Sequence, residues 1–369
     1  MTNMNNFEFR REECKAIATE KVCDVFISNN QFYIFGLTEI SEKILNYLLS
    51  KGKHVIGYIS DDEMTSFLDI PIIQLIETNK KIPVINAALL RVYQSNKLLK
   101  RIGFSSVIDY FELNLMDEDI FKFPTIDNEI RDIETNFPKY LWLYELLEDK
   151  LSKDVLACVL DMRFNNQLSP LLKHNVSNQY FDVVANFKNI DVFVDCGGYH
   201  GETSEYFILK NPNYEKVCFF EPFPDAMSIA KNELIDRNVE FIQKGVYSSS
   251  GIFKLTSGRE DGNAISLNGD ISIETCTMDE EIKEQVDFIK LDIEGSELDA
   301  LRGAENIIKK FQPIITVAIY HKQTHFWEIP QYIQSLIPEC KIYMRHNNDG
   351  IYETILHVIP KRFYSNLSN

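Results

Sequence analysis

A turn rich in glycine, between an apolar run and an amphipathic stretch, is the feature that most constrains the fold of this chain. The stretch reads Asp191-Val-Phe-Val-Asp-Cys-Gly-Gly-Tyr-His-Gly-Glu-Thr203. A strand, a glycine turn and a helix in this order open a nucleotide-binding α/β unit. Glycine lets the backbone approach a ligand closely, and the free N–H groups of the new helix then face that ligand. We therefore predict a cofactor site at Gly197, Gly198 and Gly201, with a tight turn that binds nothing as the alternative.

A second acid ends the next apolar run along the chain. The run Val217–Glu221 closes with a carboxylate that is suited to hold the two hydroxyls of a ribose. A glycine turn alone is weak support for a ligand. A glycine turn followed by an acid at the end of the next strand favours a cofactor that contains adenosine.

Ionisable side chains also follow two later apolar runs. Residues 286–292 end in Asp292, with Glu294 two positions on, and His321 follows residues 313–320. Ligands of open α/β sheets bind at the carboxyl ends of the parallel strands. The three side chains are therefore expected at the same edge of the sheet as the glycine turn, where they would form a reaction site.

Taken singly, these side chains also have structural explanations. Asp195 would cap a helix, Glu294 would pair with Lys290, and His321 would be a hydrogen-bonded histidine at the rim of the sheet. For His321 alone the structural explanation is the stronger one. The whole group favours a functional site, because so many ionisable groups are not expected by chance at one edge of a sheet.

The N-terminal third alternates between strand-like and helix-like patterns. Strands are predicted at Gln31–Gly36, His54–Ile59, Ile82–Ile85 and Val107–Tyr110. Such alternation indicates a parallel sheet with right-handed crossovers, so residues 1–112 are predicted to form a small Rossmann-like domain. After Gly36 the second and third glycines of a G-x-G-x-x-G motif are missing. We interpret the domain as degenerate, and an NAD(P)-dependent oxidoreductase that uses it is the rival function.

Residues 113–189 have mostly helical periodicity and are interpreted as a connector. From residue 190 to 369, strands and helices alternate again and end in two β-rich runs, 340–345 and 352–359, around a turn-forming Asn-Asn-Asp-Gly sequence. An α/β sheet with a terminal antiparallel hairpin is typical of class I methyltransferases. The predicted fold is therefore a class I methyltransferase domain preceded by a smaller Rossmann-like domain and a helical connector.

Charge and cysteine content exclude several classes of protein. The 369-residue chain has a formal net charge of −17, and no cluster of basic residues suggests nucleic-acid binding. The seven cysteines are scattered without a C-x-x-C pair, so neither a disulfide framework nor a zinc site is indicated. No apolar run suggests a signal peptide or a membrane span. We expect a cytoplasmic protein that acts on a small molecule; its oligomeric state, homo-oligomer or monomer, is not readable.

Over about residues 178–360 the chain resembles the FkbM family of S-adenosylmethionine-dependent O-methyltransferases. The segments that carry the resemblance are Val194–Thr203, Phe220–Pro222, Lys290–Glu297, Leu301–Ala304 and Tyr320–His321. The block Lys-x-Asp-x-Glu-Gly-x-Glu is the most specific of them. One departure is Gly197-Gly-Tyr199, where the family commonly has Gly-Ala-Asn. The tail around Glu353–Leu356 is similar to members that act in bacterial surface-polysaccharide and sugar tailoring.

The resemblance implies S-adenosylmethionine as cofactor, methylation of an alcohol, and a role for each matched residue. Those implied to bind the cofactor are Asp195, Gly197, Gly198, Gly201 and Thr203 near its methionine end, Glu221 at the ribose and Phe223 at the adenine. Ser248 or Ser249 is expected to approach the adenine from the third strand. Asp292, Glu294 and His321 are implied to face the acceptor.

Two ways to activate the acceptor hydroxyl remain open. His321 is a candidate general base, because the unperturbed pKa of histidine lies near neutral pH. Alternatively, Asp292, Glu294 and His321 hold a divalent ion such as Mg, Mn or Fe, which would acidify and orient the hydroxyl. The favoured acceptor is a nucleotide-linked sugar for capsule or other surface-polysaccharide synthesis. A catalytically silent scaffold is the alternative outside the enzymes.

Overall fold

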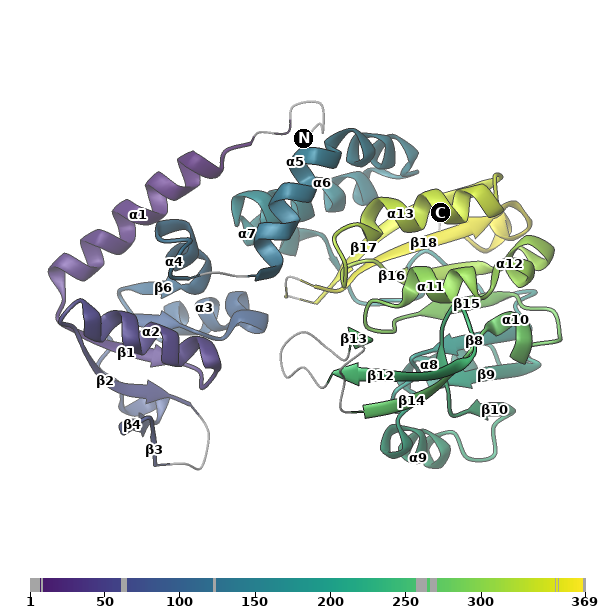
Figure 1. Ribbon diagram of the computed structural model, residues 1–369, viewed down its shortest axis with the longest axis horizontal. Coiled ribbons are helices and arrows are strands. Elements are labelled where there is room, and N and C mark those ends of the chain that lie inside the picture. Colours follow the sequence, from purple (N-terminus) through teal and green to yellow (C-terminus); the bar gives the residue numbers. More distant parts are fainter. Residues whose placement is uncertain are drawn as a thin grey trace. The chain divides into compact units, whose positions relative to one another are not determined.

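The structure, a computed structural model, describes residues 7, 9–60, 65–121, 124–256, 264–265, 271–348, 350 and 352–367. The chain divides into two compact units (Figure 1). The N-terminal unit comprises Met1–Thr135, Ala157–Lys173 and Asp349–Ile351, and the C-terminal unit comprises Asn136–Leu156, His174–Asn348 and Tyr352–Asn369. The domain boundaries at 112 and 189 stay predictions, because the stretch between them contributes to both units.

The N-terminal unit is built on a six-stranded sheet with the order β3-β4-β2-β1-β5-β6. Its strands are β1 (Gln31–Phe35), β2 (His54–Ile59), β3 (Ser66–Phe67), β4 (Ile70–Ile73), β5 (Val84–Asn86) and β6 (Val107–Asp109). Its helices include α1 (Arg11–Ser28), α2 (Glu39–Ser50), α3 (Val92–Arg101) and α4 (Tyr110–Met116). All four strands expected in this region are present, and every pairing is parallel except β3 with β4. Helices α2 and α3 make crossovers between parallel strands, as the alternating pattern predicted.

The turn after β1 uses its own polar groups internally. Gly36 has a φ of +94°, and its carbonyl oxygen accepts a hydrogen bond from the Ser41 hydroxyl at 2.9 Å. The Ser41 oxygen in turn accepts the N–H of Thr38 at 2.9 Å. A dinucleotide pyrophosphate would need N–H groups at this helix start. The N–H of Thr38 is therefore already bonded to Ser41 and is not available to a pyrophosphate. This agrees with the missing second and third glycines of the motif.

The middle of the chain is mainly helical, with α5 (Pro124–Leu146), α6 (Lys150–Asn165) and α7 (Leu168–Leu171). Helix α5 is interrupted at Asn136, where φ is −108° and ψ is 15°. Pro138 explains the kink, because proline lacks the N–H of a helical hydrogen bond and its ring crowds the preceding turn. Within the described residues, no helix combines the length and the apolar character needed to cross a membrane.

The C-terminal unit contains an eight-stranded sheet with the order β10-β9-β8-β15-β16-β18-β17-β7. Its strands are β7 (Asn175–Val176), β8 (Val192–Cys196), β9 (Lys216–Phe220), β10 (Val239–Ile242), β15 (Phe288–Leu291), β16 (Ile314–Ala318), β17 (Cys340–Asn347) and β18 (Thr354–Pro360). Strand β18 runs antiparallel to β16 and β17, and the other pairings are parallel. The predicted α/β fold with a terminal antiparallel hairpin is confirmed (Figure 1). The two-residue strand β7 lies in the stretch expected to be helical, and is too short to produce a β periodicity.

Helices and a second, smaller sheet complete the C-terminal unit. The helices are α8 (Glu202–Lys210), α9 (Pro224–Glu233), α10 (Met278–Glu281), α11 (Glu297–Arg302), α12 (Glu305–Phe311) and α13 (His325–Leu336). The smaller sheet has the order β11-β14-β12-β13 and consists of β11 (Gly245–Val246), β12 (Gly251–Thr256), β13 (Ala264–Ile265) and β14 (Ile271–Cys276). Short 3₁₀ helices are η2 (Leu75–Glu77), η3 (Leu89–Arg91), η4 (Leu172–His174) and η5 (Lys361–Asn366).

The core of the C-terminal unit explains why its central strands read as continuous apolar runs. Every residue of β8, β15 and β16 is buried, as expected for parallel strands covered on both faces. Phe181 packs its ring against Phe193 and Phe288, with centroid distances of 6.0 and 5.3 Å. This packing fixes the segment before Phe181 next to the central strands, which matters for the site described below.

Candidate functional site

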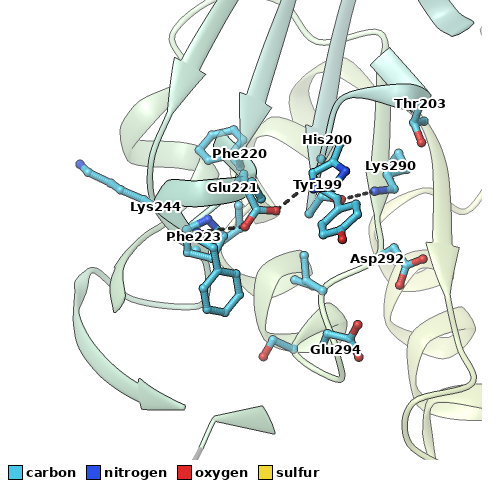
Figure 2. Close-up of a pocket in the computed structure, with 18 of the residues that line it drawn as sticks. Tyr199, His200, Thr203, Phe220, Glu221, Phe223, Lys244, Lys290, Asp292 and Glu294 are labelled. Carbon is cyan, nitrogen blue, oxygen red and sulfur yellow. Dashed lines mark hydrogen bonds between the residues drawn. The ribbon is translucent and has the colours of Figure 1, made fainter. Parts of the chain in front are cut away.

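A cavity of about 770 Å³ lies at the carboxyl ends of the central strands of the C-terminal unit (Figure 2). Its volume is within the range of small-molecule sites. Of the residues predicted to be functional, those that line it are Gly197, Gly198, Thr203, Glu221, Phe223, Asp292 and Glu294. The structure thus brings most of the predicted residues together. Three of them, Asp195, Gly201 and His321, are not part of the lining.

The glycines of the turn are required by packing within the protein. Gly197 has a φ of +75°, and a Cβ at this position would lie 2.0 Å from the backbone oxygen of Asp292. At Gly198 a Cβ would lie 2.1 Å from the ring of Phe219. From the sequence, glycine was expected here so that the backbone could approach a ligand. The structure gives a different reason for the glycines, because the turn packs against β9 and against the end of β15. Gly201 precedes α8 with a φ of +100°, which favours glycine there.

Asp195 lies outside the cavity lining, in a buried network. It is fully buried, and its carboxylate accepts a hydrogen bond from the Ser204 hydroxyl at 2.7 Å. Lys290 forms an ion pair with it at 3.1 Å and also donates to the carbonyl oxygen of Gly197 at 2.6 Å. The ammonium group thereby links Asp195 to the glycine turn. A pairing of Lys290 with Glu294 was considered from the sequence. It is wrong, because the ammonium of Lys290 pairs with Asp195 instead.

Glu221 holds the two segments on either side of it. One carboxylate oxygen accepts the N–H of Tyr199 at 3.0 Å and the other accepts the N–H of Phe223 at 2.9 Å (Figure 2). Only 4% of its surface is exposed, and burial raises the pKa of this carboxyl group. A carboxylate has about four lone-pair positions. Two positions therefore remain for hydroxyl groups in the cavity.

The side of the cavity next to Phe223 is partly apolar. Ala226 and Ile229 follow Phe223 in the chain and line the cavity, and the lining also includes Val246, Ile273 and Lys244. The ammonium of Lys244 pairs with Glu281 at 2.6 Å. Ser248 and Ser249, expected near the adenine, are not among the lining residues; the segment Lys244–Val246 lines the cavity in their place.

Asp292 is fixed by two tyrosines at the part of the cavity formed after β15. The hydroxyl of Tyr180 donates to one of its oxygens, and the hydroxyl of Tyr320 donates to the other at 3.3 Å. Burial raises the pKa of Asp292, and burial together with the Asp292 charge raises the pKa of both tyrosines. The two phenols therefore stay protonated and act as donors, which holds the carboxylate in one orientation.

His321 is clamped between carboxylates. Its Nδ1 lies 2.8 Å from an oxygen of Glu297, and its Nε2 lies 3.3 Å from Glu294 and 3.7 Å from Asp292. Burial alone would lower the pKa of His321, but the bonds to Glu294 and Glu297 outweigh it and raise that pKa to about 10. At neutral pH the ring is therefore an imidazolium. In this state it stabilises negative charge and cannot accept a proton.

Glu297 is the anchor of this cluster. It is fully buried, and the same oxygen that meets His321 accepts the N–H groups of Ile293 and Gly295, each at 3.1 Å. Burial would raise the pKa of Glu297, but its bonds to His321 and His325 hold that pKa far below the usual range. Glu297 is thus an ionised group that positions the histidine.

The residues predicted to hold a metal do not form the best ligand set. Among the described residues, the group at this end whose ligand atoms all lie within 4.8 Å of one another is Asp292, Glu297 and His321, so Glu297 stands where Glu294 was expected. Its oxygen is already occupied by two N–H groups and the imidazole. The metal-assisted alternative with Asp292, Glu294 and His321 stays a prediction.

Gln179, Tyr180, Tyr320 and Glu353, which were not predicted as site residues, also line the cavity near Asp292 or contact its neighbours. Gln179 and Tyr180 come from the segment before the core residue Phe181, Tyr320 follows β16, and Glu353 precedes β18. Gln179 donates a hydrogen bond to the carboxylate of Glu353. Burial, followed by the charge of Asp292, raises the pKa of Glu353 to about 7. No local pattern shows that these positions meet, because they come together only through the folding of distant segments.

Comparison with known proteins identifies the type of domain. Residues 182–346 match the methyltransferase FkbM domain. The crystal structure of methyltransferase FkbM from Methylobacillus flagellatus KT is similar in fold, with a TM-score of 0.65 and 19% identity over 94% of this chain and 99% of that chain. No curated protein matches the chain in sequence.

Two further solved structures have lower similarity. A putative rRNA methylase from Clostridium thermocellum has a TM-score of 0.32 and 15% identity over 50% of this chain and 92% of that chain. Fibrillarin from Aeropyrum pernix, in complex with natively bound S-adenosyl-L-methionine, has a TM-score of 0.31 and 13% identity over 47% and 67%. Similarities this low support no conclusion about the present site.

Proposed function

We propose that the chain is an S-adenosylmethionine-dependent methyltransferase of the FkbM type, as the match over residues 182–346 supports, and that it methylates a hydroxyl oxygen of a sugar. The proposal rests on the observation that Glu221 and Asp292 line the same cavity, each at its own part of the lining. The first suits a ribose, and the second is rich in hydrogen-bonding groups that suit an alcohol. When bound, S-adenosylmethionine supplies a methyl group activated by a sulfonium.

The residues of the cavity fit such a cofactor. Two N–H groups occupy two of the roughly four lone-pair positions of the Glu221 carboxylate, which supports a role for the other two as acceptors of ribose hydroxyls. Phe223 and the apolar side beside it offer a surface for the adenine, and Thr203 lines the cavity at the start of α8 for the methionine end. Asp195 acts indirectly in this proposal, by holding Lys290 and through it the turn.

The charge of the lining also favours this cofactor. Carboxylates contribute to it at Glu202, Glu221, Asp225, Asp292, Glu294 and Glu353. The two lysines of the lining, Lys244 and Lys290, are each paired with a carboxylate outside it. A lining with excess negative charge stabilises a sulfonium cation. It does not suit a phosphate inside the cavity.

The other end of the cavity presents groups that orient an alcohol. Tyr180 and Tyr320 hold Asp292, and Gln179 and Glu353 lie on the same lining. We propose that Asp292 accepts a hydrogen bond from a hydroxyl of the acceptor and so aligns its oxygen. Alignment of this kind contributes about 7–11 kcal/mol to bimolecular reactions in favourable cases.

For the acceptor we propose a nucleotide-linked sugar used in capsule or other surface-polysaccharide synthesis in the cytoplasm. The support is the resemblance of the tail around Glu353–Leu356 to sugar-tailoring members. Since the lining does not suit phosphate, the sugar would enter the cavity while the diphosphate remains outside. The N-terminal unit is not assigned a dinucleotide, because Ser41 already uses the N–H of Thr38.

The experiment that tests the proposal supplies the protein with methyl-labelled S-adenosylmethionine and a panel of UDP-glucose, GDP-mannose and methyl glucoside. Mass spectrometry and NMR of the products are expected to find the label as an O-methyl group on a sugar. EDTA is expected to leave the rate unchanged, because the Glu297 oxygen that lies nearest to Asp292 and His321 as a metal ligand is already occupied by two N–H groups and the imidazole. Label on nitrogen or carbon, or no label in any panel member, would contradict the proposal, and loss of activity in EDTA would restore the metal-assisted alternative.

A further inference from the structure

Glu353 lies at a strained position on the rim of the cavity. It has a φ of +77°, a left-handed conformation that side chains other than glycine rarely adopt. Its carbonyl oxygen accepts the N–H of Asn347 at 2.9 Å, and Thr354 then begins β18. The backbone is therefore held against its preference, with the side chain on the cavity lining. Strain of this kind is concentrated at functional positions.

The groups around Glu353 leave its carboxylate able to exchange a proton. Gln179 donates to it, while Asp292 and Glu294 repel its negative charge and His321 attracts it. Its charge also acts on the hydroxyls of Tyr180 and Tyr320, which remain protonated. Burial is the largest effect and raises the pKa of Glu353 to about 7. A general base is most effective when its pKa lies near the working pH.

The other ionisable groups at this end are committed to other partners. His321 is held as an imidazolium by Glu294 and Glu297 and does not line the cavity. Asp292 accepts hydrogen bonds from two tyrosines. Environments that push the pKa values of neighbouring groups apart separate their roles in acid–base chemistry. Asp292 is therefore suited to orient the acceptor, and Glu353 is suited to take up a proton.

We propose that Glu353 is the general base of the methyl transfer, an inference that rests on the proposed function. The acceptor hydroxyl oxygen bonds to the methyl carbon, and the carbon–sulfur bond breaks with its electron pair left on sulfur. The hydroxyl proton passes to a carboxylate oxygen of Glu353 and from there to solvent. The products are an ether, S-adenosylhomocysteine and one released proton, so atoms and charge balance.

The test compares Glu353→Gln with the wild type on the same panel of UDP-glucose, GDP-mannose and methyl glucoside. We expect kcat to fall by about 10²- to 10⁴-fold, with unchanged affinity for S-adenosylhomocysteine. The wild-type kcat should rise with pH and level off above about 7, because the base must be ionised, and this rise should be absent in the variant. Formate should restore part of the activity of Glu353→Ala. Glu339→Gln, which removes an exposed carboxylate next to β17, is the matched control and should behave as the wild type.

A second readout needs no acceptor. A carboxyl group whose pKa is raised in the folded state destabilises the fold progressively as the pH rises above its ordinary pKa, and this effect is complete above the raised pKa. Glu353→Gln should therefore raise the thermal midpoint at pH 8, above the raised pKa of about 7, and leave it nearly unchanged at pH 4, below the ordinary pKa of 4.5. A lower midpoint at both pH values would instead mean that Glu353 mainly anchors Gln179, and would overturn the proposal.

The outcomes also separate this inference from the function on which it rests. No label from the wild type contradicts the proposed function, and the role of Glu353 with it. A labelled acceptor, with Glu353→Gln at the wild-type rate and with the wild-type pH profile, contradicts the role of Glu353 alone.

Discussion

Replacing Glu221 with Ala is expected to weaken the binding of S-adenosylhomocysteine by roughly 10- to 100-fold, the equivalent of about 1.5–3 kcal/mol for hydrogen bonds to a charged group. The substitution removes the proposed acceptor of the ribose hydroxyls. It also leaves the N–H groups of Tyr199 and Phe223 without their carboxylate partner. Titration calorimetry measures the affinity directly.

Two comparisons control the Glu221 experiment. Glu233→Ala removes an exposed acid at the end of α9, outside the lining, and should bind as the wild type does. NAD, titrated in place of S-adenosylhomocysteine, should give no binding. An affinity of Glu221→Ala equal to that of the wild type would remove Glu221 from the cofactor site.

Replacing Lys290 with Met is expected to lower the free energy of unfolding of the C-terminal unit by about 3–5 kcal/mol. The reason is that the side chains of Lys290 and Asp195 are 3% and 0% exposed, so the substitution leaves a buried carboxylate without its counter-charge. The two tryptophans of the chain, Trp142 and Trp327, both lie in this unit, so urea unfolding followed by their fluorescence reports on it.

An exposed ion pair provides the control for Lys290. Lys309 and Glu305 in α12 are 53% and 43% exposed, and Lys309→Met should cost less than about 1 kcal/mol. The double variant Lys290→Met/Asp195→Asn should recover part of the loss, because it removes the buried charge. A Lys290→Met protein as stable as Lys309→Met would show that the buried pair does not hold the turn.

Local sequence patterns were sufficient for much of the fold. Apolar runs bounded by glycine and acids marked the central strands, and the turn composition marked the hairpin of β17 and β18. Strand register was not readable, although it decides the site: Lys290 pairs directly with Asp195 across β15 and β8. A pairing between positions 95 residues apart leaves no local pattern, which is why only a pairing of Lys290 with the nearby Glu294 was considered from the sequence.

The site was predictable where its residues follow strands and not where distant segments contribute. Glu221, Asp292 and Glu294 could be placed because the carboxyl ends of parallel strands meet at one edge. Gln179 and Glu353 reach the cavity from the connector and from the turn before β18, so only the fold reveals them. The charge state of His321 was also unreadable, since it depends on the buried Glu297.

The most direct test of the central claim, that one cavity joins a cofactor to an acceptor, is a crystal structure with S-adenosylhomocysteine bound. We expect the ribose hydroxyls within hydrogen-bonding distance of Glu221, and the sulfur directed to the part of the cavity lined by Asp292 and Glu353. Electron density for the ligand at another place in the chain, or a sulfur directed away from Asp292 and Glu353, would contradict it.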